Sequence, residues 1–477
     1  MTEEISSYVA GGWAPHGPGY LVASPATGEP LAQVTNATGS DLDRAVAAAR
    51  EAWQQTRWAP LRDRVAWCTA VAELIAGRAE SLAEELAVEH GKPLAEARGE
   101  IAAGVRGFHL AAEEAARLTV AAPLPTDPRK RVTVIRQPRG VWAVLTPWNF
   151  PFNIPIEYLG PAIATGSPVL WKPAPTTARI ATRLFSLILA AGLPDGLVQL
   201  VLTDSVETSG ALVAHPGVDA VGLTGGAAAG RAVARAAWDK HLLLELGGNG
   251  PVIVLDDADL TAAVPAIASS AFTNAGQVCS AAGRILAARS VADELVAGLA
   301  AEAGRRVLGP PLDPATTMGV THTPAVAATT LRHTEDALAK GARLVTGGAV
   351  RPGAPTGMWV EPTVLDDVHR GAALVVEETF GPIAPVVRLG DDDEILALAN
   401  NGRFGLVAAV FTESLRRAHR FAERLESGSV VVNDESNYWE LHLPFGGWSG
   451  TQSGRGRVGG AAAFNEFTQL KTISVQI

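Results

Sequence analysis

The sequence predicts an α/β protein built from two domains, each with a parallel sheet that helices cover on both faces. Short segments rich in Val, Leu and Ile alternate with longer Ala-rich segments of helical spacing between residues 141 and 432. Such alternation favours parallel strands, because each return to the same sheet edge needs a crossover helix. The 477 residues exceed what one hydrophobic core usually organises. Gly247 and Gly248 separate two alternating blocks and mark the expected boundary.

The N-terminal quarter is predicted to be mostly helical. Residues 41–53 open with an Asp cap and continue in Ala, Val and Leu at helical spacing. Residues 61–90 have the pattern of two consecutive helices, which Gly91 and Pro93 close. A further helix is expected at residues 96–118.

Strands and helices then alternate through the two blocks. In the first block, helices are expected from about residue 154, over residues 177–191 and after Gly230. The strands expected in the two blocks are 141–145, 168–171, 197–202, 218–223, 242–245, 252–255, 284–288, 384–389 and 408–411.

The last residues of the sequence, 472–477, alternate like a strand, and a strand at the end of a chain needs a partner. Residues 131–136 show the same alternation and are a candidate partner. The pattern leaves open whether the two segments pair within one subunit or between neighbouring subunits.

Composition excludes several classes of protein. Charged residues make up 18% of the chain and hydrophobic residues 47%, which excludes a disordered protein. The net charge of −10 argues against nucleic-acid or membrane partners. No apolar run approaches the roughly 20 residues that span a bilayer, and the acidic N-terminus lacks a secretion signal. The two cysteines form no disulfide framework, so we expect a cytoplasmic protein.

The two cysteines have different surroundings. Cys279 lies in the small polar stretch 272–280, whereas Cys68 lies in an apolar helical pattern. Free cysteines are commonly buried as small apolar residues, and that alternative suits Cys68 better than Cys279. Cys279 is therefore the candidate reactive thiol.

Two other segments carry candidate catalytic groups. Glu245 ends an apolar strand before two glycines, where burial would raise the pKa of its carboxyl toward that of a general base. The alternative is a carboxylate exposed at the strand end. Asn149 lies in the segment 146–151, where two prolines fix the backbone and leave an amide that can stabilise an oxyanion. The alternative there is a structural turn.

Glycines also mark a possible dinucleotide site. Residues 224–230, between a predicted strand and a helix, contain Gly225, Gly226 and Gly230. Glycines allow close approach of a dinucleotide, and a helix N-terminus favours phosphate. The spacing is not Gly-x-Gly-x-x-Gly, so the segment alone does not establish such a site. We expect no metal site.

These segments belong to a series of short motifs that runs through the chain. The motifs are Thr146–Pro151, Trp171–Ala174, Thr224–Gly225 with Gly230, Leu244–Gly248, Gly276–Cys279, Glu377–Pro382, Phe404–Leu406 and Pro444–Gly447. In this order they resemble the aldehyde dehydrogenase superfamily, and the resemblance covers residues 10–475. It implies NAD(P)-dependent oxidation of an aldehyde to the carboxylic acid through a thiohemiacetal and a thioester.

The resemblance implies a role for each candidate residue. Cys279 would be the nucleophile and Glu245 the general base that activates water. Asn149 and the backbone N–H of Cys279 would form the oxyanion hole. The cofactor, NAD or NADP, would have its ribose hydroxyls held by Lys172 and Glu378. Cofactor contacts are implied for Thr146, Pro147, Trp148, Lys172, Ala174, Pro175, Thr224, Gly225, Gly226, Gly230, Leu246, Gly247, Glu378 and Phe380.

The family fold has a Rossmann-like cofactor domain, an α/β catalytic domain and a small β oligomerisation arm. By resemblance, residues 1–120 and 139–247 would bind NAD(P), and residues 248–445 would form the catalytic domain. Residues 121–138 and 463–477 would form the arm. Because family members are usually dimers or tetramers, a homodimer or homotetramer that acts on a small-molecule aldehyde is expected.

The sequence departs from the family pattern at several positions. Pro175 stands where glutamate is usual, which removes a carboxylate that would hold the adenosine ribose and repel a 2′-phosphate. Lys172, Thr176, Thr177 and Arg179 are close enough in sequence to meet that phosphate, so tolerance of NADP is expected. The other departures are Gly226, Ser449 and Gln452.

The resemblance also places a group of residues around the aldehyde. Val278 offers no positive charge there, which disfavours an anionic aldehyde. Arg106 would favour one if it faced the pocket, and otherwise it is a solvated helix arginine. The full group is Arg106, Phe152, Ile154, Glu157, Val278, Ser280, Tyr438, Trp439 and Phe445.

Two other functions compete with this interpretation. A CoA-acylating aldehyde dehydrogenase would share the fold but generally lacks the general-base glutamate, so Glu245 argues against it. A non-catalytic protein that kept the fold would be expected to lose the nucleophile or the base first. Cys279, Glu245 and Asn149 are all present.

Overall fold

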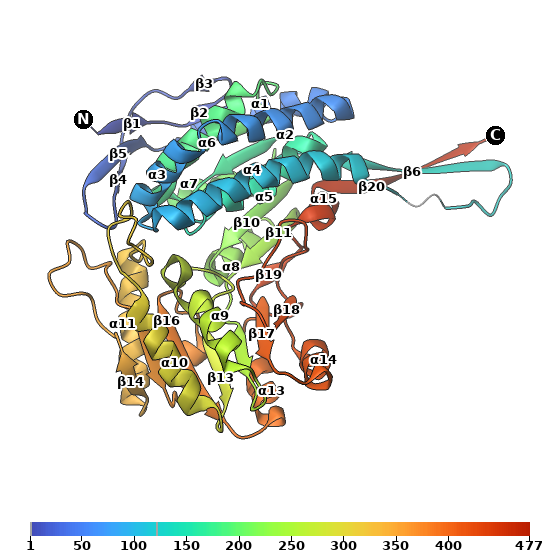
Figure 1. The fold of residues 1–477 in the computed structure, drawn as a ribbon. Coiled ribbons are helices and arrows are strands. Elements are labelled where there is room, and N and C mark those ends of the chain that lie inside the picture. The colour runs from blue at the N-terminus through green and yellow to red at the C-terminus, as the bar shows by residue number, and fades with distance from the viewer. Residues whose placement is uncertain (1, 121–122) are drawn as a thin grey trace.

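A computed structural model describes residues 2–120 and 123–477, which form two α/β units and a projecting two-stranded ribbon (Figure 1). The first unit contains an eight-stranded sheet in which five neighbouring strands are parallel, as the alternation predicts. In spatial order the strands are β19 (Gly454–Arg455), β11 (His241–Leu246), β10 (Ala220–Gly225), β7 (Trp142–Leu145), β8 (Val169–Lys172), β9 (Val198–Leu200), β2 (Tyr8–Val9) and β3 (Gly12–Trp13).

Helices cover both faces of this sheet because its side chains alternate between two apolar cores. Trp142 and Val144 pack with α2–α6 on one face, whereas Val141 and Ala143 pack with α1, α7 and α8 on the other. The helices are α1 (Gly39–Thr56), α2 (Leu61–Ala76), α3 (Ala79–His90), α4 (Leu94–Arg117), α5 (Asn153–Thr165), α6 (Ala178–Ala190), α7 (Val206–Ala214) and α8 (Ala227–Ala236).

The second unit contains a seven-stranded sheet with the same layered arrangement. Its strands in spatial order are β14 (Arg343–Thr346), β15 (Thr363–Asp366), β16 (Ile383–Leu389), β13 (Arg284–Ala288), β12 (Pro251–Val254), β17 (Val407–Phe411) and β18 (Ser429–Val432). Helices α9 (Leu260–Phe272) and α10 (Ala292–Arg305) cover one face. The other face packs against α11 (Pro324–Ala339), α12 (Ala373–Val376), α13 (Asp392–Asn400) and α14 (Leu415–Arg424).

The projecting ribbon pairs β6 (Lys130–Pro138) with β20 (Thr468–Gln476), which follows α15 (Gly460–Phe467). Figure 1 shows it extending away from both units with the C-terminus along it. The predicted pairing of these two segments is therefore confirmed within one chain. The expected strand 472–477 starts four residues earlier, because its ladder with β6 runs from Thr468.

Several local expectations need correction. Asp41 does not open α1: Thr38 is the N-cap, and Asp41 completes a capping box from the third helical position. Helix α4 begins at Leu94 rather than residue 96, because Pro93 can precede the first turn. A small sheet of β1 (Glu3–Ile5), β5 (Pro30–Thr35) and β4 (Gly19–Ala23) was not expected. Strands β14, β15 and β18 were also missed, because their short segments carry little alternation.

Candidate active site

A cavity of about 780 Å³ lies where the two units meet. Four neighbouring parallel strands of the first sheet end at it, through Leu145, Lys172, Gly225 and Leu246. Ligands of open α/β sheets bind outside the carboxyl ends of the strands. The second unit contributes Cys279, Glu378 and Phe380. The predicted cofactor residues that line the cavity are Thr146, Pro147, Trp148, Lys172, Ala174, Pro175, Thr224, Gly225, Gly226, Leu246, Gly247, Glu378 and Phe380.

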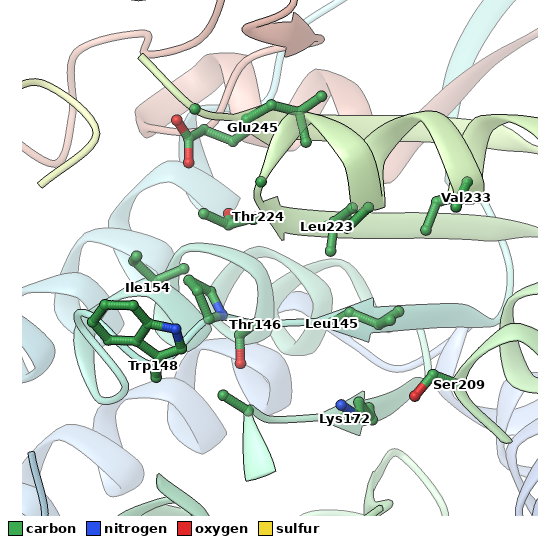
Figure 2. A pocket seen from close by; sticks show the side chains of 18 of the residues that line it. Leu145, Thr146, Trp148, Ile154, Lys172, Ser209, Leu223, Thr224, Val233 and Glu245 are labelled. Carbon is green, nitrogen blue, oxygen red and sulfur yellow. The ribbon is translucent and has the colours of Figure 1, made fainter. Parts of the chain in front are cut away.

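The cavity has two chemically distinct ends. Figure 2 shows Glu245, Trp148 and Ile154 toward one end and Ser209 and Val233 toward the other. Cys279 and Asn149 also line the cavity. The fold thus brings the predicted nucleophile, base and oxyanion donor together, although 130 residues separate Asn149 from Cys279.

Glu245 and Cys279 are neighbouring side chains in this cavity. Each influences the pKa of the other, and Glu245 Oε1 has no hydrogen-bond partner among the described residues. Glu245 is 5% exposed, and burial together with the Glu378 charge raises its pKa to about 8. Burial and then Glu245 raise the pKa of the Cys279 thiol well above its usual value. The alternative of a solvated Glu245 carboxylate is therefore excluded.

Asn149 is held beside the nucleophile by its own amide. Its Nδ2 donates a 3.0 Å hydrogen bond to the Gln277 carbonyl, and the residue is 4% exposed. An amide nitrogen carries two N–H groups, so this bond leaves one for a group in the cavity. An oxyanion donor at this position is therefore compatible with the geometry of Asn149.

The backbone before Cys279 has an unusual conformation. Asn274, Ala275 and Gly276 have φ values of 52°, 54° and 71°, all in the left-handed region. A Cβ on Gly276 would lie 2.1 Å from the Gly381 carbonyl oxygen, so glycine is required there for space as well as for φ. Left-handed non-glycine residues cost about 1 to 2 kcal/mol each, and surrounding contacts must offset that cost.

Lys172 and Glu378 supply the charged groups of the cofactor region. Burial lowers the pKa of Lys172 to about 8, with nearby Asp204 opposing the change. Glu378 Oε1 accepts a 2.8 Å hydrogen bond from the Gly248 N–H, and burial raises its pKa to about 7. A Cβ on Gly247 would lie 2.3 Å from Glu378 Oε2, so the glycine lets this carboxylate approach the strand end.

The glycines of segment 224–230 have two different roles. Gly225 ends β10, and Gly226 precedes the first turn of α8, so no side chain stands between this helix N-terminus and the cavity. Gly230 does not line the cavity. Instead a Cβ there would lie 2.3 Å from Leu246 Cδ1, so Gly230 allows α8 to pack closely on β11.

An aromatic cluster that the sequence did not indicate supports Trp148. The Trp148 ring stacks on His322 at a centroid distance of 4.9 Å, and His322 stacks on His90 at 4.8 Å. Burial lowers the pKa of His322 to about 4, so the ring is neutral at pH 7. Phe380 meets Trp148 edge-on at 5.6 Å and has a left-handed φ of 59°. No short motif marks these histidines, because they lie far from Trp148 in sequence.

Other lining residues were also missed. Helix α7 supplies Val206, which is exposed although it is apolar and stands at the first helical position. No motif in the sequence marks it. The additional lining residues are Leu145, Asp204, Val206, Ser209, Gly210, Val213, Leu223, Ala229, Ala232, Val233 and Ala236.

The expected phosphate contacts near Pro175 are only partly available. Arg179 is ion-paired with Glu3 at 3.1 Å and Glu85 at 3.2 Å, so its guanidinium is already engaged. Thr177 is buried. Thr176 is exposed, and its hydroxyl bonds His322 Nε2 at 2.7 Å.

The predicted aldehyde-binding group is not gathered in one place. Ile154 lines the large cavity, whereas Phe152 is part of the apolar core. Arg106 is exposed on α4, which supports its interpretation as a solvated helix residue. Val278 is half-buried beside Cys279.

Four further members of that group, Ser280, Tyr438, Trp439 and Phe445, lie in or beside the loop after β18. Tyr438 is 49% exposed, and its hydroxyl donates to Glu440 Oε1. Ser280 Oγ donates to Asn437 Oδ1 at 2.9 Å. The rings of Trp439 and Phe445 pack at 5.4 Å.

Glu157 lies on α5, three residues beyond Ile154. Its Oε1 accepts a 3.2 Å hydrogen bond from Asn153 Nδ2, and it lines a small cavity of about 30 Å³ with Leu441. Burial and then the Glu245 charge raise the pKa of Glu157 well above its usual value. No ion pair to Glu157 forms within residues 2–120 and 123–477.

Comparison with known proteins identifies the family. Residues 13–473 match the Aldehyde dehydrogenase family. The chain belongs to the aldehyde dehydrogenase family. A glutarate-semialdehyde dehydrogenase of Pseudomonas aeruginosa is 37% identical over 469 residues, which cover 98% of this chain and 96% of that protein. The NADP/NAD-dependent aldehyde dehydrogenase PuuC of Escherichia coli is 37% identical over 96% of this chain and 92% of its own length.

Solved structures agree with this assignment. A succinate-semialdehyde dehydrogenase from Burkholderia pseudomallei superposes with a TM-score of 0.96 at 36% identity, covering 99% of this chain and 98% of that one. This aldehyde dehydrogenase is therefore an oxidoreductase that acts on an aldehyde with NAD or NADP. The cavity fits such a dinucleotide, since it combines a glycine-edged helix N-terminus with half-buried Lys172 at the end of β8 and half-buried Glu378 from the second unit.

The structure adds two observations about metals and membranes. In the described part of the chain, no three or more His, Cys, Asp or Glu side chains gather where they could hold a metal ion. Among residues 2–120 and 123–477, no helix has the length and apolar character to cross a membrane.

Proposed function

We propose that this aldehyde dehydrogenase oxidises its substrate to the free carboxylic acid through a thioester on Cys279. The observation that supports this best is that Cys279, the buried Glu245 carboxyl and Asn149 line one cavity, with the Asn149 amide bonded to the Gln277 carbonyl two residues before Cys279. A thiol, a carboxylate and an amide in one place are the groups that acyl transfer to water requires.

The first stage forms a bond between Cys279 and the aldehyde. Glu245 takes the thiol proton, and the sulfur attacks the carbonyl carbon. The carbonyl oxygen becomes an oxyanion, which the free N–H of Asn149 stabilises. A nicotinamide cofactor, held through Lys172, Glu378 and Phe380, would supply the acceptor for the hydride that this carbon must lose before Cys279 carries a thioester.

The second stage breaks that bond. Glu245, after releasing its first proton to solvent, takes a proton from water, and the resulting hydroxide attacks the thioester carbon. The carbon–sulfur bond breaks, the thiolate of Cys279 leaves, and the carboxylic acid is released. A pKa of about 8 for Glu245 suits a base that must gain and lose a proton near neutral pH.

Cofactor binding is assigned to the strand ends of the first unit together with Glu378 and Phe380 of the second unit. Lys172 and Glu378 would hold ribose hydroxyls, and the N-terminus of α8 beside Gly225 and Gly226 would face the phosphates. Phe380 would pack near the nicotinamide ribose. We assign residues 1–120 and 139–247 to the cofactor domain, with residue 1 outside the described part of the chain.

The catalytic domain is assigned to residues 248–445, and the oligomerisation arm to residues 121–138 and 463–477. Residues 121–122 lie outside the described residues. Three apolar side chains of β20, Leu470, Ile473 and Val475, are exposed on the projecting ribbon, which supports burial against a second subunit. We propose a homodimer or homotetramer that works in the cytoplasm.

The side chains around Cys279 favour a neutral or cationic aldehyde. Those that act electrostatically on the thiol are all carboxylic acids: Glu245, Glu378 and Glu157. Their raised pKa values shift them toward the protonated form near neutral pH, and none of the three supplies a positive charge that could hold a carboxylate tail. The glutarate-semialdehyde and succinate-semialdehyde dehydrogenases are named for aldehydes that carry a carboxylate, and the side chains around Cys279 argue against such a substrate here.

A panel of aldehydes tests the proposal. NAD(P)H formation at 340 nm would be followed with neutral, cationic and carboxylate-bearing aldehydes, each with and without CoA. Oxidation without CoA, with the free acid as product, is expected. Strict dependence on CoA would establish the acylating alternative, and no activity with any aldehyde would favour the non-catalytic one. A preference for carboxylate-bearing aldehydes would refute only the substrate-charge argument.

A further inference from the structure

The start of α4 carries three ionisable side chains that lie outside the cavity yet contact both catalytic loops. Lys92, just before the helix, forms an ion pair with Glu100, and their side chains are 1% and 2% exposed. Glu96 lies one turn away, on the side of the loop that precedes Cys279. The reaction steps above use none of these groups.

The Lys92–Glu100 pair binds the backbone of the loop that carries Asn149. Lys92 Nζ donates to Glu100 Oε2 at 2.6 Å and to the Asn149 carbonyl oxygen at 3.0 Å. Glu100 Oε1 accepts the backbone N–H groups of Phe152 at 2.8 Å and Asn153 at 3.1 Å. Three of these hydrogen bonds end on the loop backbone and the fourth joins the two side chains, and each involves a charged partner.

The same backbone carbonyl also joins the nucleophile loop. The Asn149 oxygen accepts a second hydrogen bond from Asn274 Nδ2 at 2.9 Å, and the Asn274 N–H donates to Glu96 Oε2 at 3.0 Å. Asn274 begins the left-handed turn that leads to Cys279. Helix α4 thus holds the Asn149 loop through Lys92 and Glu100, and the Cys279 loop through Glu96.

A buried ion pair is weak evidence for stability, because desolvation of the two charges offsets their attraction. Apolar side chains of similar size could fill the same space without binding the loop. What distinguishes Lys92 and Glu100 is that their remaining hydrogen bonds all end on the backbone around Asn149.

We propose that Lys92 and Glu100 are positioning residues that hold the Asn149 amide in register with Cys279. The proposal rests on the oxyanion role proposed for Asn149. Without the pair, the loop can shift by a fraction of an ångström, and an oxyanion donor is effective only within hydrogen-bond distance of the developing charge. Cofactor binding should be largely spared, because Lys172, Glu378 and the N-terminus of α8 lie on other segments and Thr146, Pro147 and Trp148 precede the backbone that Lys92 and Glu100 bind.

A double-mutant cycle in the full-length enzyme tests the proposal. The variants are Lys92→Met, Asn149→Ala, their combination, and Glu100→Gln, which keeps the size and the Oε1 acceptor. Arg98→Met is the matched control, because it removes an exposed ion pair with Glu80 from the same helix. The burst rate of NAD(P)H formation, the Kd of the cofactor and the unfolding midpoint would be measured for each.

Removal of one oxyanion donor typically lowers the rate by about 100- to 1,000-fold, so Asn149→Ala should fall in that range. Lys92→Met should lower the burst rate by about 10- to 100-fold, and Glu100→Gln by less, because part of its bonding survives. The Kd of the cofactor should stay within about twofold for all variants. In the Asn149→Ala background, Lys92→Met should have less than about a threefold further effect, because its target is gone.

Distinct results would overturn the two proposals. If the effects of Lys92→Met and Asn149→Ala multiply, Lys92 does not act through Asn149 and the positioning role is wrong. If Asn149→Ala leaves the burst rate unchanged, the oxyanion role itself fails. If Lys92→Met does not fold, Glu100→Gln decides: a burst rate equal to that of Arg98→Met would reject the proposal.

Discussion

The Glu245→Gln variant gives a direct test of the buried base. The amide keeps the size of the carboxyl but cannot accept a proton from water, so the thioester should persist on Cys279. Stopped-flow measurement at 340 nm should show a burst of NAD(P)H close to one per active site, followed by slow turnover. With a pKa of about 8, Glu245 is ionised in about one molecule in ten at pH 7. Wild-type hydrolysis should therefore rise about tenfold per pH unit up to pH 8, and the variant should lose this dependence.

The same carboxyl should affect stability in a way that depends on pH. The pKa of this carboxyl is about 8 in the folded chain, whereas in the unfolded chain it has the ordinary value of 4.5. Folding therefore favours the protonated form. This contribution is fully present below pH 4.5 and is lost as the pH rises through 8. Relative to an uncharged side chain, the raised pKa lowers the free energy of unfolding by about 5 kcal/mol at pH 9 and by about 1 kcal/mol at pH 5. Urea unfolding should therefore find Glu245→Gln more stable than wild type at pH 9, and nearly equal at pH 5.

Glu80→Gln is the control for both measurements, because Glu80 is exposed and pairs with Arg98 far from the cavity. It should change neither turnover nor the pH dependence of unfolding. Full steady-state activity of Glu245→Gln would transfer the role of base to another carboxylate. An unfolding difference that does not change between pH 5 and 9 would refute the burial argument.

Three further predictions concern the nucleophile, the arm and the cofactor. Cys279→Ala should lower the rate of aldehyde oxidation by orders of magnitude while cofactor binding persists. Cys68→Ala should leave catalysis unchanged, because burial raises the pKa of that thiol to about 12. Equal activity of the two variants would contradict the assignment of Cys279 as the nucleophile. Truncation after Lys471 removes most of the exposed apolar edge of β20 and should lower the mass found by light scattering; an unchanged mass would reject the role of the arm. Pro175 lines the cavity at a position where a carboxylate would repel the 2′-phosphate of NADP. The value of kcat/KM for NAD should therefore exceed that for NADP by less than about 100-fold, or roughly 2.7 kcal/mol. A larger preference for NAD would show that another group repels the phosphate.

Much of the fold could be predicted because its signals are local. Alternating apolar segments gave the parallel strands of both sheets, and Gly91 in a left-handed conformation ends α3 as its position before Pro93 suggested. The edge elements were harder. Strands β14 and β18 are short and half-exposed, and only their neighbours in the sheet make them strands.

The sequence by itself determined which side chains are the candidates for the chemistry, because a thiol, a carboxyl and an amide stand in motifs that resemble those of the family. It did not determine their protonation, since the raised pKa of Glu245 depends on burial and on Glu378, 133 residues further along the chain. Tertiary structure also decided that Arg179 forms ion pairs with Glu3 and Glu85. Lys92 reaches the Asn149 loop in the same way, through a contact 57 residues apart that only folding creates. A local sequence pattern indicates the chemistry that a side chain is capable of. Its protonation state, its hydrogen-bond partners and its orientation depend on neighbours that are distant in sequence.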